Sequence, residues 1–199
     1  MTTAAHGMGA ALPPYECTVL DEWIDYNGHM SEAFYVLVFG YATDAAMEAL
    51  GMDATYRKDT GASLYTVEAH VRYLAETGAG APLTVTTTIA GSAAKKLHLA
   101  HEMYSHPVVD QASAVSMRRG APYSTTAPVV DQASASERVE TRAETGTLIA
   151  TEELLALHVD STTGRTSGFP QTIEANIDSF TQQAVHTPPP DWVGRSVSL

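Results

Sequence analysis

The sequence has a single cysteine, Cys17, among 199 residues. One cysteine excludes a disulfide within the chain and fits a reducing compartment such as the cytoplasm. Cys17 itself is interpreted as a small buried apolar side chain. The N-terminus lacks a basic segment followed by an apolar core, so we predict no signal peptide. No apolar run approaches the roughly 20 residues that cross a bilayer, and we therefore expect a cytoplasmic protein.

Basic residues are also scarce: the chain has 11 Lys and Arg against 23 Asp and Glu, a formal net charge of -12. This excess of negative charge argues against nucleic acid as a partner and leaves a cationic small molecule open. The sequence has no cysteine cluster and no glycine-rich phosphate loop. His98 and His101 would point to opposite faces of a strand, which makes them a poor metal pair. We expect no metal and no redox cofactor.

Hydrophobic residues make up 44% of the chain, which is typical of a globular protein. A chain of this length is expected to form one domain and to bury about 70% of its unfolded surface. We divide it into a mobile N-terminal arm over residues 1–14, a folded domain over 15–165, and a C-terminal helix and tail over 166–199.

Strands dominate the expected secondary structure. Apolar and β-branched residues predict four of them, over residues 15–24, 62–75, 83–90 and 95–104. The second strand would place Glu68 and Arg72 on the face opposite Val67 and Tyr73. Residues 147–159 fit either a helix, by propensity, or a last strand, by position.

One long helix is expected over residues 31–50, where Ser31 suits its start and Gly51 its end. Its first half is apolar on every side, which predicts that it is buried all round. A short amphipathic helix is expected over residues 172–185. A helix buried by one sheet requires that sheet to wrap around it, so we predict an α+β fold. Such a sheet often pairs with a copy of itself, which predicts a homodimer or a dimer of dimers.

Residues 105–145 are rich in Ala, Ser, Thr and Pro and are interpreted as a long inserted loop. Within this loop, the eight residues 107–114 (PVVDQASA) recur at 128–135. Two copies do not make a solenoid, which needs about three repeats, and a surface loop tolerates added length. A lid over a functional site is the alternative interpretation.

The segment from Asp25 to Met30 (DYNGHM) is the one most suited to chemistry, because a carboxylate, a glycine and a histidine directly precede the long helix. Free N–H groups and the positive end of the helix dipole attract anionic and polarised groups to a helix start. A carboxylate held there can attack a polarised carbonyl or activate water against it. The structural alternative is that Asp25 only shapes a turn.

This motif, extended by Trp23 and Ile24, resembles that of the hotdog-fold acyl-CoA thioesterases. Tyr35, Phe39, Ala42 and Asp44 on the helix and the segment 65–72 (YTVEAHVR) share the resemblance. It is closest to the betainyl-CoA thioesterases of carnitine breakdown, which also resemble a domain of some L-carnitine dehydrogenases. Further matches are 96–99 (KLHL), 157–160 (LHVD), Gly164, Arg165 and the tail 190–195. The chain departs from the family in residues 105–145, where a short hairpin is usual.

The resemblance implies an antiparallel sheet around one helix and hydrolysis of an acyl-CoA with Asp25 as the catalytic carboxylate, either nucleophile or general base. The N–H of Gly28 would hold the carbonyl oxygen as it becomes negative. Asn27 would orient Asp25 or cap the turn, and His29 is a packing residue or a base. Glu68 would face the helix start of a partner subunit, where it could position water or pair with a cationic acyl group.

Substrate-binding residues are expected among aromatic and basic side chains. The quaternary ammonium of betaine suits aromatic faces, and the aromatic residues near the motif or the strand are Trp23, Tyr26, Tyr35 and Tyr65. The phosphates of coenzyme A, which is part of the substrate and not a cofactor, need cations, and those on the expected sheet are Arg72, Lys95 and Lys96.

Other functions stay open at this stage. They are a thioesterase for a different acyl-CoA and a non-catalytic hotdog protein that binds acyl thioesters. A hotdog dehydratase would need a histidine and a carboxylate together on the helix, and Asp44 and Glu48 have no such partner nearby.

Overall fold

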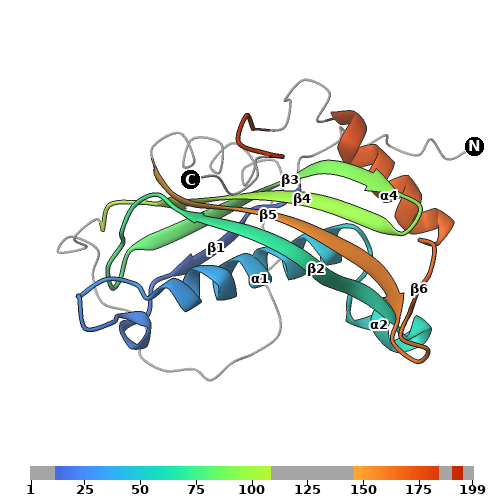
Figure 1. Cartoon of the computed structure of the whole chain (residues 1–199), viewed down its shortest axis with the longest axis horizontal. Helices are drawn as coiled ribbons and strands as arrows, with labels where there is room; N and C mark the ends of the chain where they lie inside the picture. The colour runs from blue at the N-terminus through green and yellow to red at the C-terminus, as the bar shows by residue number, and fades with distance from the viewer. Residues whose placement is uncertain (1–11, 109–145, 184–189, 195–199) are drawn as a thin grey trace, which may run out of the picture.

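The computed structural model describes residues 12–108, 146–183 and 190–194. Its central feature is one antiparallel sheet with the strand order β1-β3-β4-β5-β2, to which β6 adds beside β5. Figure 1 shows the strands curving together over a single long helix. The strands are β1 Tyr15–Thr18, β2 Ala62–Tyr73, β3 Pro82–Ala93, β4 Lys96–Ser105, β5 Thr147–Asp160 and β6 Arg165–Thr166.

The long helix, α1, covers Glu32–Ala49 and lies against one face of the sheet (Figure 1). Val38 and Phe39 of α1 are fully buried, as are Leu97 and Leu99 on β4. Because strand side chains alternate between faces, this inner face is apolar while the other face carries polar groups. The predicted α+β arrangement is confirmed.

The prediction that the first half of α1 is buried all round is wrong for the single chain. Val36, Leu37 and Tyr41 are 46%, 38% and 40% exposed. The sheet of one chain covers only one side of the helix, so the second apolar side of α1 is left uncovered. An exposed apolar patch of this kind is typical of an interaction surface.

Several predicted boundaries differ from the structure. The strand expected over 15–24 ends at Thr18, and a 3-10 helix, η1, follows at Asp21–Trp23. Strand β3 runs beyond the predicted residue 90, through a bulge next to Gly91, to Ala93. The ambiguous segment 147–159 is strand β5, because pairing with β2 on one side and β4 on the other overrides its local helix propensity.

Among the described residues, two further helices flank the α1–sheet core. Helix α2, Ala54–Thr60, was not predicted, although the Asp53 side chain caps its start and Gly61, at φ 67°, ends it. Helix α4, Gln171–Gln183, matches the expected amphipathic helix as far as the described residues reach. It packs beside the C-terminal end of α1, where the Asn176 Nδ2 group donates to the Leu50 carbonyl at 3.0 Å.

The structure describes only part of the two chain termini and of the insertion. Leu12 is 7% exposed and packs in the core, so the mobility expected of the N-terminal arm is wrong at that residue. Residues 1–11 lie outside the described part of the chain. The same holds for the insertion beyond Val108 and for nearly all of its duplicated segment. Among the described helices none is long and apolar enough alone to cross a membrane. Only α1 with α2, bent by 74°, passes by length and composition.

Candidate active site

The segment between η1 and α1 forms a tight turn around Asp25. The Asp25 N–H donates to the His29 carbonyl at 2.9 Å, and the Gly28 N–H donates to the Asp25 carbonyl at 3.0 Å. Gly28 has φ 84°, a conformation that side chains other than glycine rarely adopt. Asn27 holds the Asp25 carboxylate through its N–H at 2.7 Å and its Nδ2 group at 3.4 Å. The turn therefore presents a half-buried carboxylate in a fixed orientation.

The predicted role of the Gly28 N–H as a donor to the carbonyl oxygen is at odds with this geometry, because that N–H is used within the turn. The start of α1 offers other donors. The first N–H groups of a helix have no partner within it, and the Ser31 side chain makes no capping hydrogen bond. The Ser31 N–H donates to the Trp23 carbonyl at 2.9 Å, which fixes the helix start beside the turn.

His29 and Met30 attach this turn to the segment after β2. His29 Nδ1 lies 3.4 Å from the Glu76 carboxylate, and both side chains are largely exposed. The Met30 N–H donates to the Thr77 carbonyl at 2.9 Å. In this structure His29 pairs with Glu76, and its role as a packing residue or as a base stays a prediction.

The four aromatic residues expected to bind substrate lie in different surroundings. Trp23 is 7% exposed and stacks on Phe34 at 5.4 Å, so it is a core residue. Tyr26 is 98% exposed at the tip of the turn, and Tyr65 is half exposed on β2. Tyr35 is buried on α1, and its hydroxyl donates to the Ala75 carbonyl at 3.3 Å.

Tyr35 lies beside Tyr73, in a group of residues with Glu32 and Glu152 that the sequence analysis did not select. Its ring meets that of Tyr73, at the end of β2, edge to face at 5.3 Å. The Tyr73 pKa is raised by burial and by two carboxyl groups, Glu32 at the start of α1 and Glu152 on β5. Glu152 is 5% exposed, and burial raises its pKa to about 7.

His101 is the cross-strand neighbour of Glu152 on β4. It is fully buried, stacks on Phe39, and has a ring nitrogen within hydrogen-bond distance of Thr43 at 3.1 Å and of Thr87 at 2.9 Å. Burial lowers its pKa to about 3, so the ring is neutral at physiological pH. His101 is a structural residue of the inner face.

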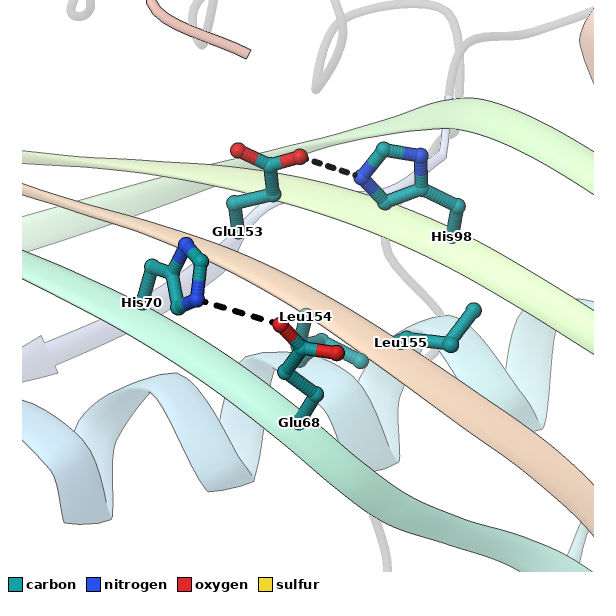
Figure 2. A pocket seen from close by; sticks show the side chains of 6 residues that line it. All are labelled: Glu68, His70, His98, Glu153, Leu154 and Leu155. Carbon is teal, nitrogen blue, oxygen red and sulfur yellow. Dashed lines mark hydrogen bonds and ion pairs between the residues drawn. The ribbon is translucent and has the colours of Figure 1, made fainter. Parts of the chain in front are cut away.

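The predicted opposite orientation of His98 and His101 is confirmed, since His98 lies on the outer face. There His98 pairs with Glu153 at 2.8 Å, and His70 pairs with Glu68 at 3.2 Å. Figure 2 shows the two pairs on neighbouring strands, with α1 behind the sheet. With Leu154 and Leu155 these four residues line a pocket of about 240 Å³.

The C-terminal tail also lies on the outer face. The Gly194 N–H donates to both oxygens of Glu153, at 2.8 and 3.0 Å, and Trp192 Nε1 donates to Glu102 at 3.1 Å. Glu68 therefore belongs to an outer-face pocket and makes no described contact with the Asp25 turn of its own chain.

The three cations expected to bind coenzyme A are all exposed, but they are not together. Arg72 lies opposite Thr151 of β5, whereas Lys96 lies opposite Leu157, six positions along the same strand. Six strand residues span about 20 Å. Lys95 precedes Lys96 and contacts the Thr166 carbonyl at 3.5 Å. Over the described ranges, no three His, Cys, Asp or Glu side chains are grouped so as to hold a metal ion.

Comparisons with known proteins bear on this site. The family model of the thioesterase-like superfamily matches residues 19–177. The betainyl-CoA thioesterase of Pseudomonas aeruginosa is 33% identical over 192 residues, covering 96% of this chain and 98% of that protein. The L-carnitine dehydrogenase/betainyl-CoA thioesterase of Agrobacterium fabrum is 34% identical over 92% of this chain, which spans only 30% of that longer protein. The solved structure of a candidate thioesterase from Pseudomonas putida has 30% identity and a TM-score of 0.66, covering 97% of this chain and 99% of that one.

Proposed function

Since the chain belongs to the thioesterase-like superfamily and is an acyl-CoA thioesterase, we propose that its substrate is betainyl-CoA, hydrolysed to betaine and coenzyme A in carnitine breakdown. The observation that carries the proposal is the end-to-end match to a betainyl-CoA thioesterase. The Agrobacterium relative supports it, because its name joins the same activity to oxidation of carnitine. The enzyme would act in the cytoplasm and need no cofactor.

In the proposed reaction Asp25 is the catalytic carboxylate. Either it attacks the thioester carbonyl to give an anhydride that water then opens, or it takes a proton from the water that attacks. In both routes the C–S bond breaks, coenzyme A leaves as the thiol after gaining a proton, and the acyl group leaves as a carboxylate. Asn27 supports this role because both of its donors hold the Asp25 carboxylate. The role of His29 is to fasten the turn to Glu76.

The carbonyl oxygen needs donors where negative charge develops, and the first N–H groups of α1 are suited to this. They stand beside the Asp25 turn and receive no cap from Ser31. Gly28 then serves the reaction by allowing the turn, and not through its own N–H.

A homodimer is part of the proposal. β2 is one of the two edge strands in the order β1-β3-β4-β5-β2, and Val67 and Tyr73 on it are 53% and 47% exposed. An open edge with apolar side chains favours pairing with a second copy. The exposed side of α1, with Val36 and Leu37, would be covered in the same interface. Glu68 of one copy would then approach the site of the other.

Coenzyme A requires cations for its phosphates. Arg72 lies on the same outer face of β2 as Glu68, so we assign it, like Glu68, to the substrate bound at the Asp25 turn of the other copy. Lys95 and Lys96 lie toward the opposite end of the sheet and would contact the substrate only from another copy. Tyr65 and the exposed Tyr26 are further binding residues on this proposal.

Release of thiol from a panel of acyl-CoAs tests the proposal directly. We expect betainyl-CoA to be hydrolysed with a higher kcat/KM than acetyl-CoA or a long-chain acyl-CoA. A preference for another acyl group would keep the thioesterase and contradict the betainyl assignment. Binding of coenzyme A without turnover of any thioester would indicate a non-catalytic binding protein.

A further inference from the structure

Glu152 lies on the inner face of the sheet, although the neighbouring Glu153 lies on the outer face. Its partners across the strands are His101 on β4 and Val71 on β2. Directly paired strand residues point to the same face, and His101 bonds to Thr43 of α1. Glu152 therefore points into the layer between the sheet and α1.

A buried carboxylate normally has a cation or hydrogen-bond donors beside it, because an unpaired buried charge is costly. Glu152 is 95% buried and makes no hydrogen bond or ion pair with any other residue that the structure describes. The histidine opposite it is neutral and has both ring nitrogens paired with threonines. The nearby Arg72 is on the other face of β2, since Tyr73 faces α1.

The surroundings of Glu152 are aromatic and negatively charged. Tyr73 is close enough for Glu152 and Glu32 to raise its pKa, and its ring meets Tyr35 at 5.3 Å. Glu76 has the same effect on Tyr35. Carboxylates and tyrosine rings together are the surroundings that bind organic ammonium ions.

The group formed by Glu152, Tyr73, Glu32 and Tyr35 extends to the proposed reaction centre. Glu32 is the first residue of α1, where the carbonyl oxygen would bind, and Tyr35 follows within one helical turn, about 5.4 Å along the axis. In betainyl-CoA a single methylene separates the carbonyl carbon from the trimethylammonium group. A cation site for this substrate must therefore lie next to the start of α1.

We propose that Glu152, together with the rings of Tyr73 and Tyr35, binds the cationic group of the acyl chain and so determines the acyl specificity of the enzyme. This inference rests on the proposed betainyl-CoA activity and deepens it. The substrate supplies the positive charge that the described residues of the chain do not place beside Glu152. A neutral acyl group of the same shape would leave this carboxylate unpaired and is disfavoured.

The test compares betainyl-CoA with 3,3-dimethylbutanoyl-CoA, in which a tert-butyl group replaces the trimethylammonium group without its charge. The wild-type enzyme is expected to favour betainyl-CoA in kcat/KM. Glu152→Gln removes the charge at nearly constant shape and should lower that preference roughly 10- to 100-fold, with activity on the neutral substrate kept or increased. Glu152→Asp should retain part of the preference.

Glu48→Gln is the matched control, because Glu48 is an exposed carboxylate on the far half of α1, and this variant should keep the wild-type preference. An unchanged preference in Glu152→Gln, or an equal loss on both substrates, would overturn the role of Glu152. Failure of Glu152→Gln to fold would also contradict it, since removal of an unpaired buried charge should stabilise the protein. A wild-type enzyme that prefers the neutral substrate would instead contradict the betainyl-CoA proposal itself.

Discussion

Glu152 and His101 are buried neighbours whose pKa values are displaced in opposite directions. Burial raises the pKa of Glu152 to about 7 and lowers that of His101 to about 3. Burial disfavours the charged form of each group. In the absence of substrate, Glu152 and His101 are therefore both favoured in their neutral forms.

The raised pKa of Glu152 predicts a specific pH dependence of stability. Between its unfolded pKa of 4.5 and its folded pKa of about 7, the folded state binds more protons than the unfolded state. This contribution to stability is therefore present at low pH and is lost as pH rises to 7. Glu152→Gln should be more stable than wild type above pH 7, by up to about 3 kcal/mol, and equally stable near pH 4.5.

Urea unfolding of both proteins across this pH range measures the difference. His101 has the opposite effect, because its lowered pKa removes stability as pH falls from 6.5 toward 3. Its effect is common to both proteins and cancels in the comparison. A difference between the two that does not change with pH would contradict the buried, unpaired state of Glu152.

Asn27→Ala should affect the rate of the reaction more than the binding of substrate. The backbone N–H of residue 27 keeps its bond to the Asp25 carboxylate in this variant, so only the Nδ2 bond at 3.4 Å is lost and the carboxylate is held less firmly. Full misorientation of a reacting group by about 1 Å can cost about 100-fold. Because one of the two bonds remains, we expect a smaller fall in kcat, roughly 3- to 10-fold, with little change in KM. Steady-state kinetics beside Glu22→Ala, an exposed residue of η1, checks this. An equal kcat in both variants would contradict it.

At the residue scale, the sequence was sufficient to select candidate side chains, but not to predict the backbone geometry of the turn that holds them. The carboxylate of Asp25 and its partner Asn27 follow from residue type and spacing. The engagement of the Gly28 N–H could not be predicted, because it depends on the conformation of the turn. The inward orientation of Glu152 or Glu153 could have been predicted from the sequence. Two consecutive residues on a strand point to opposite faces, so one of these two glutamates must face the core.

Helix α4 shows how much one element depends on a few apolar contacts. Ile177 is 2% exposed and packs with the C-terminal part of α1. Ile177→Ala should lower the free energy of unfolding by roughly 2–5 kcal/mol, as measured by urea denaturation. Asp178→Ala, on the exposed side of the same helix, should change it by less than about 0.5 kcal/mol. An equal loss of unfolding free energy in the two variants would contradict the packing of Ile177 of α4 against α1.

At the element scale, the local sequence predicted α1 from propensity and from its end residues Ser31 and Gly51, α4 from helical spacing, and β2, β3 and β4 from their apolar and β-branched residues. It could not decide segment 147–159, because the two strands that pair with it come from earlier in the chain and local propensity carries no information about them. Helix α2 was missed because its seven residues, Ala54–Thr60, are too few to give a periodic signal. Its Asp53 cap and its terminal Gly61 were nevertheless visible in the sequence.

For the whole molecule, the exposed apolar residues of α1 and β2 predict a dimer in solution. Val67→Arg places a charge on the open edge of β2 and should shift the protein toward the monomer, as measured by sedimentation. Val108→Arg, at an exposed valine that follows β4, should leave the dimer intact. A monomeric wild-type protein, or loss of the dimer in both variants, would contradict this assignment of the interface.

The overall architecture was predictable because one buried helix and alternating strands leave few arrangements. The prediction that α1 is buried on every side is wrong for the single chain, but it fits the proposed dimer, in which a second copy would cover the exposed apolar side of α1. In the proposed dimer the second copy would bind at Val36 and Leu37 on α1 and at the edge of β2.

Hydrolysis of betainyl-CoA by wild type and by Asp25→Asn is the measurement that tests the central claim most directly. The substitution keeps the size of the side chain and its place in the turn, but removes the negative charge that acts as nucleophile or base. We predict thiol release by the wild-type enzyme and a fall in kcat/KM of about a thousandfold or more in the variant. A folded Asp25→Asn protein with near wild-type activity would contradict the assignment of Asp25 as the catalytic carboxylate.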